Sequence, residues 1–194
     1  MNCGGDFVEL RLDYLPTINP DILEKVRRKR TIITIRDISE GGINYVKPEL
    51  KRRILSRARE LGLMYDIEAR FLIKYPMPFR NEIVSVHYIN SPPEDPNEPI
   101  SLMEKFREAF SLKLAVTKGK NCLNTLLKFL ETYSNSSVMP LEDSFRTRLA
   151  FALLGSKLFY VNCGESTAPG QISISQFKSI MSKINGIESE RISS

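Results

Sequence analysis

Histidine and cysteine are scarce in this sequence, which excludes the commonest metal and disulfide frameworks. Its 194 residues include one histidine and three cysteines, at Cys3, Cys122 and Cys163. The cysteines are odd in number and form no C-x-x-C pair, so neither a disulfide framework nor a zinc site is indicated. A single histidine does not suffice for the usual multi-histidine metal site either, although carboxylates alone could hold magnesium.

Long apolar runs are absent as well. No run approaches the roughly 18–20 residues that span a bilayer, and residues 1–6 lack the basic and apolar regions of a secretion signal. Hydrophobic residues make up 42% and charged residues 26% of the chain, as in ordinary globular proteins. We therefore expect one soluble, cytoplasmic domain over residues 1–194 that engages no membrane, with a frayed tail at 188–194.

Basic residues exceed acidic ones, which gives a formal net charge of +5. Much of the excess lies in two runs, Lys25–Arg30 and Lys51–Arg59. Such runs could bind nucleic acid or form a solvated helix face. Acidic residues interleave with them and no aromatic stacking pattern accompanies them, which favours the solvated face and no nucleic-acid partner. A basic protein could still favour a small anionic substrate.

Short apolar runs alternate with longer amphipathic stretches, which predicts repeated strand–helix units and a parallel sheet. The expected strands lie near Asp6–Leu12, Thr31–Arg36, Met64–Glu68, Ile83–His87, Leu112–Val116, Ser137–Leu141 and Leu158–Asn162. The expected helices are Pro20–Arg28, Pro48–Leu61, Glu98–Phe110, Asn121–Tyr133, Ser144–Leu154 and Ser175–Ile184. Segment Arg70–Arg80 is too broken by prolines to predict a helix, and Asn90–Pro99, with four prolines, is expected to be a loop.

Side chains alternate in character along the expected strands. Because residues i and i+2 share a face, Leu112 and Leu114 lie on one face and Lys113 on the other. A sheet covered by helices on both faces would be apolar on both, whereas here one face collects charge toward the C-terminal strand ends. A TIM-like α/β barrel explains the pattern, since charged side chains then converge inside at the top. An open sheet with one face in water is the alternative.

Lys113 is the sharpest candidate for chemistry. It lies within the apolar sequence S-L-K-L-A-V, so an inward-facing side chain would lose much of its hydration. Burial and nearby cations such as Arg36 or Arg148 are expected to lower the pKa of Lys113, and a neutral amine can attack a ketone to form an imine. A lysine that reaches water from a strand edge is the alternative.

His87 ends the strand V-S-V-H just before the proline-rich loop. Any imidazole acid–base step near neutral pH must use it, although a lone histidine can equally be structural.

Three further groups have two interpretations each. Glu40, in the Glu40-Gly41-Gly42 turn, could orient the imidazole or belong to a simple turn. Arg148 could clamp a carboxylate or pair on the surface, and Gln171 could bind a hydroxyl or end an ordinary Pro-Gly turn.

Seven segments form an ordered set along the chain. They are E-L-R-L-D at Glu9–Asp13, I-R-D-I-S-E-G-G at Ile35–Gly42, D-I-E at Asp66–Glu68, V-H-Y-I-N-S-P at Val86–Pro92, L-K-L-A-V at Leu112–Val116, R-L-A at Arg148–Ala150 and S-T-A-P-G-Q at Ser166–Gln171. Only the last is distinctive alone. Together and in this order, the chain resembles the type I 3-dehydroquinate dehydratases of the shikimate pathway.

The resemblance implies a (β/α)8 barrel, a homodimer, no metal or organic cofactor, and a lyase that converts 3-dehydroquinate to 3-dehydroshikimate and water by syn elimination. By position, Lys113 matches the lysine that forms the Schiff base, His87 the general acid–base and Glu40 the carboxylate that supports it. The positions that match substrate contacts are Glu9, Arg11, Arg36, Arg148, Thr167 and Gln171. Thr167 stands where relatives often have serine.

The first expected strand matches the second strand of the family's barrel, so the family's first strand and helix are expected to be missing. We therefore expect seven strands and an incompletely closed barrel, with the gap covered by a neighbouring subunit or by rearranged termini.

Two other functions remain open. One is another lysine-imine barrel enzyme such as an aldolase, against which the lack of a Gly-rich phosphate cradle argues. The other is a truncated barrel that binds its ligand without turnover.

Overall fold

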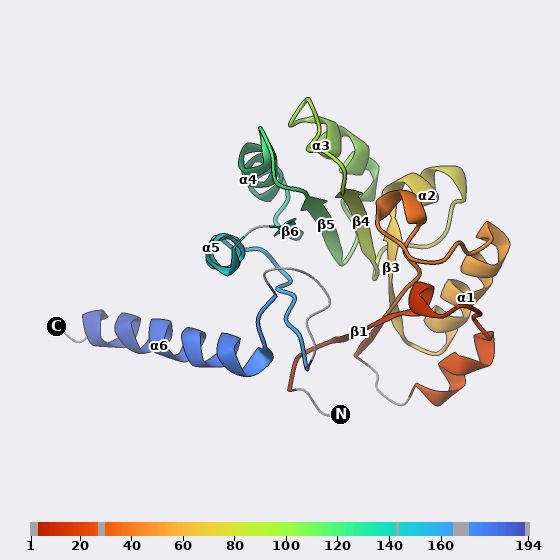
Figure 1. Cartoon of the computed structure of the whole chain (residues 1–194), viewed down its shortest axis with the longest axis horizontal. Helices are drawn as coiled ribbons and strands as arrows, with labels where there is room; N and C mark the ends of the chain where they lie inside the picture. The colour runs from red at the N-terminus through yellow and green to blue at the C-terminus, as the bar shows by residue number, and fades with distance from the viewer. Residues whose placement is uncertain (1–3, 27–29, 143, 165–170, 193–194) are drawn as a thin grey trace.

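The computed structural model describes residues 4–26, 30–142, 144–164 and 171–192, with side chains described as far as residue 184. Six parallel strands form one sheet in the order of the sequence. They are β1 Val8–Arg11, β2 Thr31–Thr34, β3 Met64–Glu68, β4 Ile83–Tyr88, β5 Ser111–Val116 and β6 Ser136–Pro140. The sheet curls into part of a barrel (Figure 1), which confirms a parallel α/β fold in which each strand is placed beside the preceding one.

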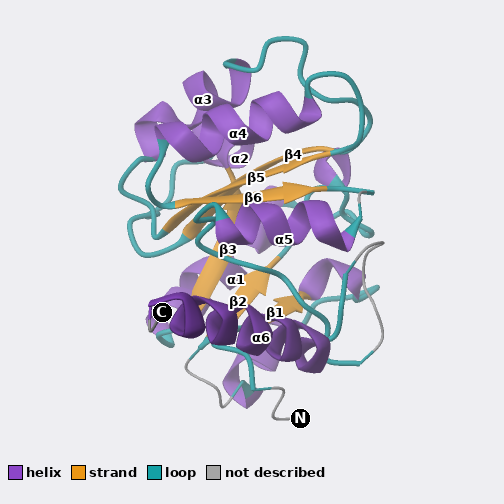
Figure 2. Cartoon of the chain, turned by 90° about the vertical axis from the view of Figure 1, so that its left-hand side faces the viewer, coloured by secondary structure: helices purple, strands orange, loops and turns teal. Residues whose placement is uncertain are grey.

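Helices cover the outer face of the curled sheet (Figures 1 and 2). They are α1 Pro48–Glu60, α2 Ala69–Lys74, α3 Glu98–Met103, α4 Cys122–Thr132 and α5 Phe145–Leu153, and α6 Ile174–Ile192 follows at the C-terminus. Short 3-10 helices lie at Leu12–Tyr14, Pro20–Lys25, Ile38–Glu40 and Glu104–Phe106. None of the helices in the described ranges combines the length and apolarity that crossing a membrane requires.

The hydrophobic core lies between the sheet and its outer helices. Leu112 and Leu114 of β5 are fully buried in one cluster with Leu126 and Phe129 of α4. Each such side chain contributes about 1.5–3 kcal/mol when it leaves water. The apolar face predicted from alternation is therefore the helix-covered face, and the charged residues of the same strands point to the inner side.

The seventh strand predicted over Leu158–Asn162 is wrong, because serine hydroxyls occupy the hydrogen bonds that a strand ladder would use. The backbone N–H of Val138 donates to Ser156 Oγ at 3.0 Å, and that of Leu158 donates to Ser137 Oγ at 3.0 Å. Within the described ranges the segment forms a single bridge, between Asn162 and Ser173. The sheet therefore ends at β6.

The incomplete closure predicted for the barrel is present, since β1 and β6 are the two edges of the sheet. The chain after β6 passes between these edges on its way to α6 (Figures 1 and 2). Phe159 in this segment stacks on Phe177 of α6, with ring centroids 4.5 Å apart. A Cβ on Gly5 would lie 3.5 Å from Ile174 Cδ1, so the start of α6 lies against the N-terminal segment.

Several predicted boundaries need correction. The segment Arg70–Arg80 does contribute a helix, because α2 forms and ends before Pro76, which disfavours a helical residue before it. The helix predicted over Pro20–Arg28 is a 3-10 helix over Pro20–Lys25, and residues 27 and 28 lie outside the described residues. The helix predicted over Glu98–Phe110 stops at Met103 and continues as a 3-10 turn. Helix α6 continues to Ile192, where a frayed tail was expected from residue 188.

Candidate active site

The candidate site lies on the inner face of the sheet, where the register of three adjacent strands aligns polar side chains. Ser85 of β4 pairs with Glu68 of β3 on one side and with Lys113 of β5 on the other. His87 lies two residues farther along β4 and shares the face of Ser85. The only imidazole and the strongest lysine candidate therefore come from neighbouring strands and project to the same side.

Lys113 is 4% exposed, and its Nζ donates a hydrogen bond of 2.9 Å to Asp66 Oδ2. The same atom lies 4.3 Å from the centroid of the Tyr160 ring. Burial disfavours the ammonium, but the Asp66 carboxylate outweighs this effect and raises the pKa of Lys113 above its ordinary value. The lowered pKa predicted from the sequence is wrong, because a carboxylate two strands away faces the amine. In the free protein Lys113 is an ammonium.

Arg36 forms ion pairs with both carboxylates of β3, Asp66 and Glu68. Its guanidinium lies 2.9 Å from Asp66 Oδ2 and 3.0 Å from Glu68 Oε1, and it donates to Ser85 Oγ at 2.7 Å. Ser85 in turn donates to Asp66 Oδ1 at 2.5 Å. Burial alone would raise the pKa of Asp66, but Arg36 and Lys113 lower it further than burial raises it. Asp66 therefore stays ionised and fixes both cations.

Glu40 orients His87 from the turn after β2. Its Oε2 atom lies 3.0 Å from His87 Nδ1 and accepts a 2.8 Å hydrogen bond from the His87 backbone N–H. Gly41 ends the 3-10 helix at φ +91°, and a Cβ on Gly42 would lie 2.0 Å from the carbonyl oxygen of Arg36. Both glycines are thus required by the backbone, and the predicted orienting role of Glu40 has the geometry that it needs.

Burial sets the protonation states of this pair. It lowers the pKa of His87 well below its ordinary value, and the nearby cations Arg36 and Lys113 act in the same direction. It also raises the pKa of Glu40 to about 7, with the charge of Glu68 adding to the effect. His87 is therefore neutral near pH 7. When Glu40 is ionised it accepts a hydrogen bond from Nδ1–H, and Nε2 is left as the basic nitrogen.

The two early-strand candidates also lie on the inner face. Glu9 accepts a 2.6 Å hydrogen bond from Thr34 Oγ1. Arg11 is paired with Asp13 through two hydrogen bonds of 2.8 and 2.7 Å, and it also donates to the carbonyl of Gly41 at 3.3 Å. Both are thereby fixed within the site by neighbouring polar groups.

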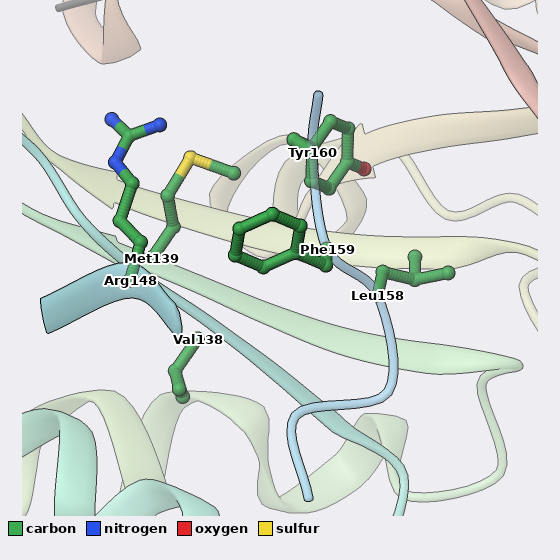
Figure 3. Close-up of a pocket in the computed structure, with 6 residues that line it drawn as sticks. All are labelled: Val138, Met139, Arg148, Leu158, Phe159 and Tyr160. Atoms are coloured by element: carbon green, nitrogen blue, oxygen red, sulfur yellow. The ribbon is translucent and has the colours of Figure 1, made fainter. Parts of the chain in front are cut away.

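Of the three candidate residues in the C-terminal third, the structure describes Arg148 and Gln171 but not Thr167. Arg148 is buried rather than on the surface, at 5% exposure, and lies beside Met139 at a cavity of about 10 Å³ that Tyr160 also lines (Figure 3). Gln171 follows the gap in the described ranges, and its carbonyl accepts a 3.3 Å hydrogen bond from Asn162 Nδ2. Thr167 lies outside the described residues. In the described part of the chain, no group of three or more His, Cys, Asp and Glu side chains could hold a metal ion.

Comparison with known proteins decides the family. No family model matches the chain. The 3-dehydroquinate dehydratase of Sulfolobus acidocaldarius is 40% identical over 186 residues, which cover 95% of this chain and 84% of that protein. That of Saccharolobus solfataricus is 42% identical over 192 residues, covering 94% and 86%. The chain belongs to the 3-dehydroquinate dehydratase family. The resemblance carried by the seven ordered segments is thereby confirmed.

Solved structures of the family show the same fold. The 3-dehydroquinate dehydratase of Aquifex aeolicus superposes with a TM-score of 0.73 at 22% identity, covering 94% of this chain and 89% of that one. A type I enzyme from Clostridium difficile, with covalently modified comenic acid, gives a TM-score of 0.70 at 22% identity, covering 92% and 81%. The curled sheet is thus the fold of this dehydratase family with part of the barrel missing from the strand order.

Sequence reasoning missed several polar groups that surround the candidates. They are Asp66, Glu68, Ser85, Arg70 and Lys51, together with the aromatic Tyr160. The alternation of D-I-E already placed Asp66 and Glu68 on the polar face of β3, and this signal could have identified them as partners of Lys113 and Arg36. No comparable signal exists for Tyr160, because it lies outside a regular strand.

Lys51 corrects the prediction that the run Lys51–Arg59 is a solvated helix face. Its side chain is fully buried, although it begins on α1. Its Nζ lies 2.5 Å from Glu68 Oε2 and 2.9 Å from Asp37 Oδ1, and 4.4 Å from the centroid of the Phe71 ring. Lys51 therefore pairs with the Glu68 oxygen that Arg36 does not contact, and we infer that it supports the position of Arg36 in this dehydratase fold.

Replacing Lys51 with methionine is expected to lower the free energy of unfolding by about 3–5 kcal/mol, because the change leaves a buried carboxylate without one of its two cations. Denaturant unfolding followed by circular dichroism measures the loss. Arg52→Met on the exposed side of the same helix is the control, with an expected change within about 0.5 kcal/mol. The double variant Lys51→Met/Glu68→Gln should recover part of the loss. Equal stabilities of the Lys51 and Arg52 variants would contradict the assignment.

Proposed function

We propose that this chain is a type I 3-dehydroquinate dehydratase, a lyase that acts through a Schiff base on Lys113 with His87 as general acid–base. One observation carries the proposal: a buried amine and the only imidazole of the chain project from neighbouring strands onto the same inner face, in a member of this family. Holding both groups against one bound ring is what an imine-assisted elimination needs.

The reaction begins with the loss of a proton from the Lys113 ammonium. The amine attacks the ketone carbon of 3-dehydroquinate, and loss of water from the carbinolamine gives an iminium that withdraws electrons from the adjacent carbon. Nε2 of neutral His87 removes a proton from that carbon, which forms an enamine. The enamine expels the neighbouring hydroxyl as His87 returns the proton to it. Hydrolysis of the product iminium releases 3-dehydroshikimate and regenerates Lys113.

The remaining inner-face groups are proposed to bind the substrate. Arg148 would pair with the substrate carboxylate bidentately, and Arg36, Glu9 and Arg11 would contact ring oxygens, with Thr167 and Gln171 closing over the ligand. The protein's own carboxylates already hold Arg36 and Arg11 in place. The predicted homodimer stays a prediction.

Incubation with 3-dehydroquinate tests the proposal, with the absorbance of the conjugated enone product followed over time. Turnover is expected without added metal, and borohydride should inactivate the enzyme only when substrate is present, leaving an adduct on Lys113 in the mass spectrum. Turnover that borohydride does not affect would contradict the Schiff base. An adduct without turnover would favour a ligand-binding barrel. Turnover of an aldol substrate in place of dehydroquinate would favour the aldolase alternative.

A further inference from the structure

Tyr160 carries a buried hydroxyl that the proposed mechanism does not use. It belongs to the segment after β6, where the backbone N–H of Lys157 donates to the carbonyl of Ser136 at 2.8 Å and keeps the segment beside that strand. The Lys113 Nζ lies over the Tyr160 ring, 4.3 Å from its centroid. In Figure 3 the Tyr160 hydroxyl oxygen lies on the side of the ring away from Arg148. Tyr160 therefore lines a cavity with Arg148, while its ring lies against the Lys113 amine and its hydroxyl points away from Arg148.

The Tyr160 hydroxyl has no hydrogen-bond partner among the described residues, although its oxygen is shielded from solvent. Leaving such a group without a partner costs stability, and a phenylalanine would offer the same ring to the Lys113 ammonium without that cost. Burial raises the pKa of Tyr160, so the phenol keeps its proton near neutral pH and remains a donor. The Lys113 ammonium beside it is itself a donor, so the phenol O–H has no acceptor among the described residues. A buried donor of this kind, next to the lysine proposed to bind the ligand covalently, points to a ligand oxygen as its acceptor.

The strand order indicates which oxygen that is. Lys113 on β5 lies between His87 on β4 and Tyr160 after β6. With the ketone carbon of the substrate joined to Lys113, the ring carbon on one side of it loses its proton to His87. The ring carbon on the other side bears a hydroxyl that the reaction leaves in place. In this orientation that carbon would lie toward Tyr160.

We propose that Tyr160 is a specificity residue of this site, and that its hydroxyl donates a hydrogen bond to the substrate hydroxyl on the carbon next to the ketone, on the side away from His87. This inference rests on the proposed function. It explains why the donor has no acceptor within the described part of the chain, and it assigns the recognition of one ring hydroxyl to the segment that passes between the two sheet edges.

The test compares Tyr160→Phe with the parent protein on 3-dehydroquinate and on an analogue that lacks this one hydroxyl. With dehydroquinate, the variant is expected to lose about tenfold in kcat/KM, the effect of one good hydrogen bond. With the deoxy analogue, parent and variant should be equal. The melting temperature of the variant should be unchanged or higher, because a buried donor without a partner has been removed.

Tyr133→Phe is the matched control, since the Tyr133 hydroxyl donates to the carbonyl of Ile100 at 2.8 Å far from the site. It should lower the melting temperature and leave kcat/KM unchanged. Full activity of Tyr160→Phe on dehydroquinate would overturn the inference while the proposed function stands. Equal losses on both substrates would also overturn it, because Tyr160 would then act through Lys113. No turnover by the parent protein would refute the proposed function, and this inference with it.

Discussion

Lys113→Ala is expected to abolish Schiff-base trapping and to lower kcat/KM for 3-dehydroquinate at least about a thousandfold. The variant lacks the amine that forms the iminium, so the carbon next to the ketone loses its electron sink and its proton becomes far less acidic. Intact-mass spectrometry after borohydride reduction in the presence of substrate measures the adduct, and enone absorbance measures turnover. A substrate-sized adduct on the alanine variant would show that another lysine carries the imine.

Lys113→Arg separates the chemistry from folding. Lys113 and Arg36 are the cations paired with Asp66 in the described part of the chain, and the alanine variant leaves that buried carboxylate with Arg36 and the Ser85 hydroxyl. Arginine keeps a cation beside Asp66 but forms no imine, so it should unfold closer to the parent and still give no adduct. If the alanine and arginine variants trap equally little but unfold at different temperatures, the loss of trapping is a loss of chemistry.

The pH dependence of trapping follows from the raised pKa of Lys113. The ammonium must lose its proton before it attacks, so the fraction of reactive amine increases as the pH rises toward that pKa. The initial rate of adduct formation in the parent protein should therefore rise from about pH 6 to about pH 9. A rate that stays constant over this range would mean that the amine is already neutral and that Asp66 does not hold its proton.

Alternation along the strands was enough to predict which residues face inward. Lys113 and His87 each lie in a strand with apolar neighbours on both sides, and a period of two fixes their face without knowledge of the partner strands. The same reasoning predicted that charge gathers on the inner side, and the cluster around Asp66 and Arg36 confirms it. The Glu40-Gly41-Gly42 turn left Glu40 with two interpretations, and its place beside His87 came from the family resemblance.

The register between strands was not predictable from the sequence. The wrong direction predicted for the pKa of Lys113 followed from not knowing this register. Which carboxylate faces the amine depends on how β3, β4 and β5 align, because a shift of one residue reverses the face of every side chain in a strand. The alternation pattern therefore pointed to a buried Lys113 but not to the Asp66 partner whose charge outweighs that burial. Similarly, Lys51 lies in a basic helical run, and only the position of α1 against the sheet shows that it reaches Glu68.

The failure of the seventh strand has a local physical cause. Leu158–Asn162 has the apolar and aromatic content of a strand, but Ser137 and Ser156 accept hydrogen bonds from backbone N–H groups between it and β6. Propensity describes one segment, whereas a strand needs a neighbour whose backbone is available along its length. The stretch after β3 is the opposite case, because a helix forms where none was predicted. Helix α2 occupies six residues that contain no proline and ends before Pro76.

His87→Ala is expected to lower kcat by about 10² to 10⁴, the range typical of a removed general base, while imine formation survives. Lys113 and Asp66 remain in place in this variant, so the substrate can still join the lysine but its proton is removed slowly. Borohydride reduction should therefore trap more adduct during steady-state turnover than in the parent protein. A variant that turns over at the parental rate would remove His87 from the mechanism, and one that forms no adduct would place its role before the imine.

The pH profile of kcat distinguishes an acid–base role for His87 from a structural one. The pKa of Glu40 is raised to about 7, so Glu40 becomes ionised as the pH rises through that value. The ionised carboxylate accepts a hydrogen bond from the Nδ1–H of His87, which keeps the proton on Nδ1 and leaves Nε2 free to act as base, so kcat should increase across the same interval. Glu40→Gln keeps a hydrogen-bonding partner that does not ionise, and it should remove the step near pH 7 while leaving the broader rise caused by deprotonation of Lys113. A glutamine variant whose profile still shows the step near pH 7 would contradict this role of Glu40.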